Sequence, residues 1–368
     1  MDVKIIYFSG LNGLRAIAAL AVVISHTTLA LKAFNLSPFI FGVAKDGTPK
    51  GLILAGYGVT IFFVLSGFLI TYLLQAEKDI QEINIKKFYV RRILRIWPLY
   101  YLYLIICVAV MLLYKHHLDI KVLLLYIFYA ANIPFILGNS FGFLAHYWSL
   151  GVEEQFYLFW PWVNKKLNNR VIIPIITLVI VLLIGIKIGV HFLYPHSIIN
   201  SAIHFHCMII GGLGAILYKR KNTLFLRITD NKLSQIICWL VIFLLAINKF
   251  HIASIIDGEI ICIVSLTLII GQIQIKNRII NLETNVLDFL GKISYGMYVT
   301  HPILIFFLVP ILNAIPIQNF YKYLLVYFSV LSTTIAVSYL SYNYFEKYFL
   351  SWKHRFIVID SASSKHFR

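Results

Sequence analysis

Eleven apolar runs of about 20 residues, separated by short polar connections, constrain the fold of this chain most strongly. A helix of about 20 apolar residues is long enough to cross the hydrocarbon core of a bilayer. Only 13% of the 368 residues are charged and 60% are hydrophobic, whereas soluble domains carry about 25% charged residues. The sequence therefore predicts an all-α, polytopic bundle of transmembrane helices. The runs lie near 12–34, 52–75, 95–114, 121–138, 143–163, 171–193, 199–218, 234–250, 254–274, 294–313 and 321–345.

The basic residues predict how the chain is threaded through the membrane. Connections rich in Lys and Arg follow the second, fifth, seventh, ninth and last runs, and such connections remain on the cytoplasmic side. Eleven crossings would divide them between the two sides, whereas ten crossings place all of them in the cytoplasm. We therefore expect about ten crossings, with eleven as the alternative, and both termini in the cytoplasm. The same rule explains the net charge of +17 without a nucleic-acid partner.

Residues 139–163 form the run that we expect not to cross. This segment contains Glu153 and Glu154 and is preceded by the glycine-punctuated stretch 138–142. Polar, irregular backbone at membrane depth is tolerated where it is buried in protein or lines a wet cavity. We therefore expect a re-entrant or tilted segment here.

The sequence predicts one transmembrane domain over residues 1–350 and a basic cytoplasmic tail over residues 351–368.

Two ionisable residues lie inside the first apolar run, Arg15 and His26. Eleven residues at about 100° each make three turns plus about 20°, so both side chains share one helical face, about 16 Å apart. Ionisable groups inside a membrane span are costly and usually face a protein interior, which makes them candidates for a functional site. The alternative is an anchoring arginine and a histidine that is hydrogen-bonded within the packed core.

Three arginines begin the third run, Arg91, Arg92 and Arg95. Their spacings of three and four residues let at least two guanidinium groups project together from one end of a helix. Planar guanidinium groups suit bidentate contact with phosphate, so the pattern fits a phosphorylated donor from the cytoplasm. An anchor at the membrane interface, with Trp97 and nearby tyrosines as its aromatic belt, explains the same residues.

Two further sets of polar residues lie within otherwise apolar segments of the sequence. Glu153 and Glu154 are adjacent and flanked by aromatics, so one can pair with an arginine while the other orients a histidine for proton transfer. Ser294, Tyr298 and His301 are spaced by four and three residues and form one helical stripe that can bind a donor or relay protons. The alternatives are glutamates that face water on an interfacial helix, and ordinary hydrogen bonds between helices.

The sequence predicts no metal site. His204 and His206 are two residues apart, and this spacing points the two rings to different faces of a helix. The cysteines are scattered through apolar runs and are expected to be buried, inert thiols: Cys107, Cys207, Cys238 and Cys262. Close helix packing is sufficient to explain the small residues of the second run: Gly58, Ser66 and Gly67.

Five motifs occur in one order along the chain: Arg15 with His26, FFVLSGFLIT at 62–71, FYVRRILRIWPLYY at 88–101, WSLGVEEQFYLFWP at 148–161 and SYGMYVTH at 294–301. In combination they resemble the integral-membrane acyltransferase family 3. This group of bacterial inner-membrane O-acyltransferases modifies surface polysaccharides, lipopolysaccharide, Nod factors and some antibiotics. The resemblance extends from Leu11 to about Glu346. Some relatives carry a fused extracytoplasmic domain, and this chain is similar to the stand-alone members.

The resemblance implies transfer of an acyl group, usually acetyl, from cytoplasmic acyl-CoA to a hydroxyl of a carbohydrate or lipid-linked glycan acceptor, without a metal. It makes His26 the expected catalytic base or acyl relay, with Glu153 or Glu154 orienting or deprotonating. The competing class is a proton-coupled exporter or flippase of a glycan precursor or lipid, in which the same groups form the substrate path. The residues that the resemblance implies for donor binding are Arg15, Arg91, Arg92, Arg95, Ser294, Tyr298 and His301.

Overall fold

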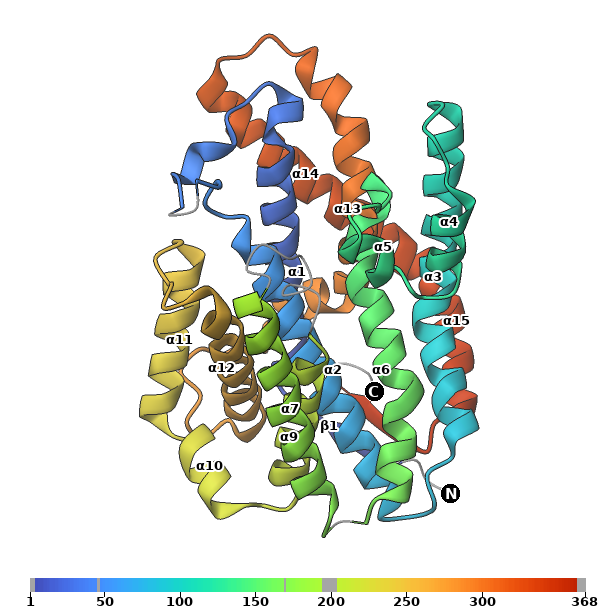
Figure 1. Ribbon diagram of the computed structural model, residues 1–368, viewed down its shortest axis with the longest axis vertical. Helices are drawn as coiled ribbons and strands as arrows, with labels where there is room; N and C mark the ends of the chain where they lie inside the picture. Colours follow the sequence, from blue (N-terminus) through green and yellow to red (C-terminus); the bar gives the residue numbers. More distant parts are fainter. Residues whose placement is uncertain (1–3, 45–46, 169, 194–203, 363–368) are drawn as a thin grey trace.

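The computed structural model describes residues 4–44, 47–168, 170–193 and 204–362, and helices dominate it (Figure 1). The all-α prediction is confirmed, with two short strands as the addition, β1 Lys4–Tyr7 and β2 Ile359–Ala362. Five short 3-10 or π-helical turns lie at Leu31–Phe34, Pro38–Phe41, Gly142–Tyr147, Tyr342–Glu346 and His354–Phe356. The α-helices are α1 Leu11–Ala30, α2 Ile53–Lys78, α3 Ile85–Leu113, α4 Ile120–Ile127, α5 Asn132–Ile136, α6 Trp148–Lys166, α7 Ile172–Leu193, α9 Phe205–Lys219, α10 Thr223–Thr229, α11 Lys232–Ala246, α12 Ser254–Gln274, α13 Asn285–Asn313, α14 Asn319–Ser341 and α15 Lys347–Lys353.

Seven helical segments of the described chain are long and apolar enough to cross a membrane. Helices α10 and α11 make an eighth if this pair, bent by 51°, counts as one span. Helix α9 is apolar but has only 15 residues. The polytopic architecture is therefore confirmed, whereas threading by ten crossings stays a prediction. The seven segments are Leu11–Phe34, Ile53–Lys78, Ile85–Leu113, Ile172–Leu193, Ile256–Gln274, Asn285–Asn313 and Asn319–Lys353.

The structure differs from the predicted runs between α3 and α6. The run near 121–138 forms only the short helices α4 and α5, because Tyr129 adopts a left-handed φ of 56° that ends α4. Residues 139–163 instead pass through a 3-10 turn into the unbroken helix α6. Helix α6 ends beside the end of α2, where Lys78 Nζ donates to the carbonyl oxygens of Asn164 (2.7 Å) and Leu167 (2.6 Å).

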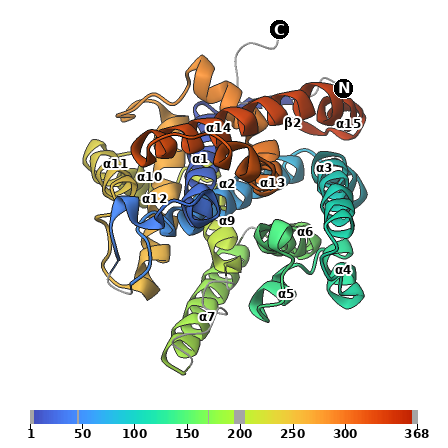
Figure 2. The same cartoon turned by 90° about the horizontal axis from the view of Figure 1, so that it is seen from above.

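Helix α1 packs between α2 and α13 at the centre of the bundle, while α7 projects at one edge and α3 with α4 at another (Figure 2). Glycines allow the central helices to approach closely, as predicted for Gly58 and Gly67. A Cβ at Gly58 would lie 2.6 Å from the carbonyl oxygen of Ala18, and one at Gly67 would overlap the carbonyl oxygen of Met208 on α9. Such backbone approach is a main source of helix association in lipid.

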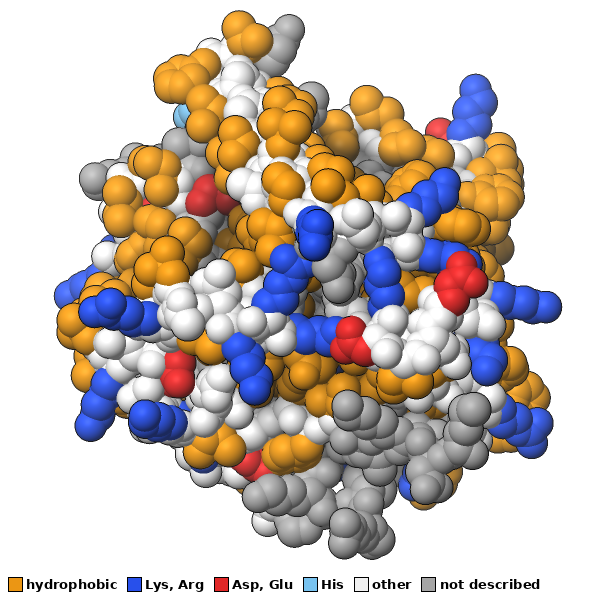
Figure 3. All heavy atoms as spheres, turned by 90° about the horizontal axis from the view of Figure 1, so that it is seen from below, with side chains coloured by type: hydrophobic (Ala, Val, Ile, Leu, Met, Phe, Trp, Pro, Cys, Tyr) orange, Lys and Arg blue, Asp and Glu red, His pale blue; other side chains and the backbone are white. Residues whose placement is uncertain are grey.

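One end of the bundle carries the predicted basic connections, and we call it the basic end. Lys78 lies there at the end of α2, with Lys165 paired to Glu82 at 2.8 Å and Lys219 paired to Asp79. Figure 3 shows Lys and Arg side chains spread over this face of the molecule. These basic connections, which the sequence assigned to one side, therefore do lie together.

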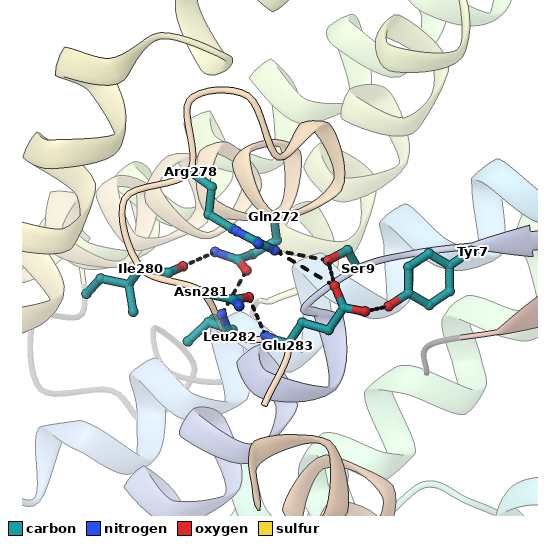
Figure 4. A network of polar contacts seen from close by, with 8 residues as sticks. All are labelled: Tyr7, Ser9, Gln272, Arg278, Ile280, Asn281, Leu282 and Glu283. Atoms are coloured by element: carbon teal, nitrogen blue, oxygen red, sulfur yellow. Dashed lines mark hydrogen bonds and ion pairs between the residues drawn. The ribbon is translucent and has the colours of Figure 1, made fainter. Parts of the chain in front are cut away.

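Strand β1 pairs in parallel with β2, so the first and last described segments meet near the basic end. A polar network fastens β1 to the connection between α12 and α13 (Figure 4). The hydroxyls of Tyr7 and Ser9 donate to the carboxylate of Glu283, and Arg278 Nη1 donates to Ser9 Oγ at 3.1 Å. Gln272 of α12 bonds the backbone of the same connection. This network holds the beginning of α1 against α12 and α13.

Candidate active site

A cavity of about 110 Å³ opens between α1, α2, α3, α6 and α13. Its lining extends along α2 from Val59 to Leu73, which is about 21 Å of helix. Leu73 is five residues from Lys78 at the basic end, and Val59 follows Gly58, where α2 contacts α1. The cavity therefore leads from near the basic end toward the centre of the bundle. Its polar lining comprises Arg15, Ser66, Arg92, Arg95, Ser149, Glu153, Tyr157, Ser294, Tyr295 and Tyr298.

The lining carries an excess of positive charge. Arg15 projects from α1, and Arg92 and Arg95 from α3, whereas Glu153 is the one carboxylate among the described lining residues. No acidic side chain of the described chain lies within 4.0 Å of any of these three guanidinium groups. Arginine keeps its charge in proteins, so three cations face one anion. Such a cavity is suited to an anionic ligand.

Arg15 and Arg92 are held by neutral groups instead of by acids. Arg15 Nη1 donates to Asn12 Oδ1 at 2.9 Å, one helical turn earlier. The guanidinium carbon of Arg92 lies 5.8 Å from the ring centres of both Phe88 and Tyr157, a distance typical of cation–π contact. Among the described residues, the buried Nε atom of Arg92 has no hydrogen-bond partner. These contacts position the guanidinium groups of Arg15 and Arg92 and leave donors of both free for a ligand.

The two adjacent glutamates point in different directions, because neighbouring residues on a helix lie about 100° apart. Glu153 faces the cavity, where its Oε1 accepts from Ser66 Oγ at 2.6 Å and from the Tyr157 hydroxyl. Glu154 points away and accepts from Trp97 Nε1 at 3.3 Å, while its buried Oε1 has no hydrogen-bond partner. Within the described part of the chain, neither carboxylate lies within 4.0 Å of the arginine or histidine nitrogen that the sequence suggested.

His26 contacts a second histidine, His301 of α13. His301 Nδ1 lies 3.0 Å from the carbonyl oxygen of Met297 and must donate to it, since a carbonyl only accepts. In a neutral imidazole the Nε2 of His301 is then an acceptor, and it lies 2.7 Å from His26 Nδ1. His26 therefore donates through Nδ1 and keeps a lone pair on Nε2. This is the form of histidine that can remove a proton from a hydroxyl.

Tyr298 stands between the cavity and the histidines. Its hydroxyl donates to the carbonyl oxygen of His146 at 2.8 Å and lies 2.6 Å from Ser149 Oγ. The ring of His146 in turn lies 5.3 Å from that of His301, centre to centre. Three buried or partly buried imidazoles thus gather just behind the inner end of the cavity.

The distance between His26 and the cavity follows from the position of His26 along α1. Val22 packs against Gly58 beside the inner end of the cavity, since a Cβ at Gly58 would lie 2.9 Å from Val22 Cγ2. His26 follows Val22 by four residues, or about 6 Å along the helix. The histidine pair therefore lies about one helical turn beyond the cavity.

The structure brings most of the predicted site residues together. His26 and His301 form the adjoining pair. Arg91 faces elsewhere, because its Nη2 pairs with Glu77 at 3.3 Å and its Nη1 donates to the carbonyl of Phe356 at 2.8 Å. Roles in catalysis or donor binding stay predictions for all of these residues. The predicted residues that line the cavity are Arg15, Arg92, Arg95, Glu153, Ser294 and Tyr298.

Sequence reasoning missed several polar residues of the site. Ser66 was assigned to packing, yet it donates to Glu153 and lines the cavity. Tyr157 follows Glu153 by four residues, a spacing that places both on one helical face and could have identified it. Ser149 and His146 gave no such signal, because the groups they meet belong to α13.

Comparison with known proteins gives a family match over most of the chain. The sequence model of acyltransferase family 3, described as an acyltransferase domain, matches residues 8–343. This range begins before Arg15 and ends beyond His301, so it includes every residue of the cavity and of the histidine pair.

Several curated proteins are similar in sequence. A Staphylococcus aureus (strain MRSA252) protein, provisionally named an O-acetyltransferase, is 29% identical over 401 residues, which cover 96% of this chain and 60% of that protein. The peptidoglycan O-acetyltransferase of Listeria monocytogenes serovar 1/2a (strain EGD-e) is 36% identical over 190 residues, 45% of this chain and 27% of its own length. The chain thus spans about three fifths of the length of the Staphylococcus aureus protein. No solved structure matches the chain significantly.

Proposed function

This chain belongs to acyltransferase family 3, and on that premise we propose that it is a membrane O-acyltransferase. Its donor would be a cytoplasmic acyl-CoA, with acetyl-CoA as the first choice, and its acceptor a hydroxyl of a carbohydrate. The observation that carries the proposal is the cavity in which Arg15, Arg92 and Arg95 face only one carboxylate and which ends one helical turn from the His26–His301 pair.

The donor fits the charge and shape of this cavity. Coenzyme A carries phosphate groups at one end and a thioester at the end of a long flexible arm. Guanidinium groups bind phosphate through short, charge-assisted hydrogen bonds, and Arg15, Arg92 and Arg95 offer unpaired donors. The length of the lining, about 21 Å along α2, lets the arm extend from the arginines toward the histidines. We propose that the basic end is cytoplasmic and admits the donor.

The histidine pair supplies the chemistry of transfer. The Nε2 lone pair of His26 takes the proton of the acceptor hydroxyl as that oxygen attacks the thioester carbonyl carbon. The intermediate then breaks its C–S bond, and the departing thiolate recovers the proton from the imidazolium. His301 accepts from Nδ1 of His26 throughout and fixes the ring. In a two-step variant, Nε2 itself attacks the thioester, the C–S bond breaks and the thiolate leaves; the acyl group then passes from Nε2 to the hydroxyl oxygen, whose proton goes to the thiolate.

The acceptor is proposed by comparison with relatives. One similar protein is named a peptidoglycan O-acetyltransferase, so we propose a bacterial surface glycan or its lipid-linked precursor, modified at the inner membrane. This chain spans only part of the length of these relatives. The proposed acceptor therefore rests only on the part of each relative that matches this chain.

The test is transfer of radiolabel from acetyl-CoA in inverted membrane vesicles, with native acceptor present. Label in the glycan or glycolipid fraction of the wild type, and its loss in His26→Ala, is the expected result. Absence of label from both, with unmodified glycan crossing the membrane, would favour the proton-coupled exporter. Label that persists in His26→Ala would keep the acyltransferase but remove His26 from its chemistry.

A further inference from the structure

A second buried polar cluster lies outside the cavity, where α7, α9 and α12 meet. It contains His206 and Cys207 of α9 and Glu259 and Cys262 of α12, with Lys187 of α7 beside them. His206, Cys207 and Cys262 are at most 1% exposed. None of the five lines the cavity, so the proposed acyl transfer leaves this cluster without a role.

The four cysteines are buried, as expected, but Cys207 and Cys262 are not isolated from each other. Cys207 and Cys262 lie 55 residues apart in sequence, yet the ligand atoms of His206, Cys207 and Cys262 all fall within 4.8 Å of one another. The expectation that His204 and His206 point to different faces is wrong, because their rings stack with centres 6.3 Å apart and His204 Nδ1 lies 3.8 Å from Cys207 Sγ. Packing of α9 against α12 creates the group, and no local spacing reveals it.

The His206–Cys207 distance matches that of a tetrahedral metal site. His206 Nε2 lies 3.4 Å from Cys207 Sγ and 2.9 Å from Glu259 Oε2. Zinc binds nitrogen and oxygen at about 2.0–2.2 Å and sulfur at about 2.3 Å, so tetrahedral ligands lie roughly 3.3–3.8 Å from each other. The Glu259 carboxylate lies outside the set of ligand atoms that fall within 4.8 Å of one another, so it would have to move toward the thiols to become the fourth ligand.

The charges of the cluster point the same way. Glu259 Oε2 is buried and lies 2.9 Å from His206 Nε2, whereas Oε1 accepts from Lys187 Nζ at 2.6 Å. A divalent ion with two thiolates and one carboxylate carries one negative charge, and the Lys187 ammonium cancels it. Neutrality matters because an uncompensated charge in an apolar interior is very costly. Lys187 would also orient the ligating carboxylate, as outer-shell partners of metal ligands do.

We propose that His206, Cys207, Glu259 and Cys262 bind one Zn²⁺. The imidazole coordinates through Nε2 and the carboxylate through Oε2, and each thiol releases its proton as it binds. All four positions are taken by protein, as in structural zinc sites. The ion would fix α9 to α12. Since Met208 of α9 packs against Gly67 of α2, the site would support the wall of the cavity from behind.

The first test is the metal content of the full chain, purified in detergent without a polyhistidine tag and without chelators. The wild type should carry about one zinc per chain, and Cys207→Ser and Cys262→Ser should lose it. The matched controls are Cys107→Ser and Cys238→Ser, which remove equally buried thiols and should retain zinc. Equal zinc in all five proteins, or none in the wild type grown with zinc, would overturn the proposal.

A second test uses only the wild type, because a serine variant could simply fail to fold. Alkylation followed by peptide mapping should find Cys207 and Cys262 protected in the zinc-loaded protein and reactive after chelation. Cobalt substitution should give a thiolate-to-cobalt charge-transfer absorption. Reactivity that is the same with and without chelator, or a disulfide between the two cysteines in the purified protein, would contradict the site.

Discussion

His26 Nδ1 lies 2.7 Å from His301 Nε2, although the two residues are 275 positions apart in the sequence. The carbonyl of Met297 fixes the proton on His301 Nδ1, and this fixes the direction of the bond from His26. The protein thereby presents the free Nε2 of His26 without using a carboxylate to orient the ring. We infer that His301 is a positioning residue for His26.

Substitution of His301 tests this inference. His301→Leu should lower kcat by about 10²-fold, within the range of general-base effects, with KM for acetyl-CoA nearly unchanged. His301→Gln should recover much of the loss, because its amide can both accept from His26 and donate to Met297. The measurements are kcat, KM and the pH–rate profile in proteoliposomes. Full activity of the leucine variant, or equal loss in both variants, would rule out the positioning role.

Arg92 should contribute to donor affinity. Arg92→Gln should raise KM for acetyl-CoA about 10–100-fold, which corresponds to the loss of a hydrogen bond to a charged group. Arg92→Lys should give an intermediate value, because lysine keeps the charge but lacks the planar fork. Arg170→Gln is the control, since Arg170 is exposed and lies outside the cavity. Unchanged KM in Arg92→Gln would place the donor phosphates elsewhere.

Glu153 should weaken donor binding through its charge. Glu153→Gln keeps an acceptor for Ser66 and Tyr157 but removes the one carboxylate of the described lining. Loss of about 1 kcal/mol of repulsion would tighten binding of coenzyme A about fivefold. Equilibrium binding of labelled coenzyme A to the purified protein measures this, with Glu154→Gln as the charge-matched variant outside the cavity. Weaker binding in Glu153→Gln would show that Glu153 itself contacts the donor.

Gly67 should be essential for the contact of α2 with α9. A methyl group at this position would overlap the carbonyl oxygen of Met208, so Gly67→Ala should destabilise the fold by about 1–3 kcal/mol. Gly56→Ala on the same helix is the control, because nothing lies within 4 Å of its added Cβ. Thermal unfolding in detergent compares the two. Equal melting temperatures would mean that α9 moves freely relative to α2.

Local spacing predicted much of the fold and part of the site. The apolar runs identify the helices because length and composition are local properties, and the spacing of Arg92 and Arg95 correctly brings both guanidinium groups to one cavity. The adjacent glutamates were predicted to share a site, but their 100° separation sends Glu154 to Trp97. The break after α4 depends on the left-handed backbone of Tyr129, which composition does not reveal.

The features that escaped prediction are contacts between distant helices. The pairing of His26 with His301 and the approach of Cys207 to Cys262 both depend on which helix faces lie together. In lipid, small residues such as Gly58 and Gly67 decide these faces through close approach. A single sequence shows that the small residues are present but does not show which helix each of them meets.

The pairing of β1 with β2 sets the order in which this protein can be completed. Ribosomes produce about 5–20 residues per second, so roughly 20–70 s separate the synthesis of Tyr7 from that of Ala362, its neighbour across the pair. During that time β1 has no strand partner, and Arg91 lacks the Phe356 carbonyl to which it donates. The strand pair therefore forms only after every described helix of the bundle has been made, and a nascent chain stalled before β2 would display an open strand edge to chaperones and proteases.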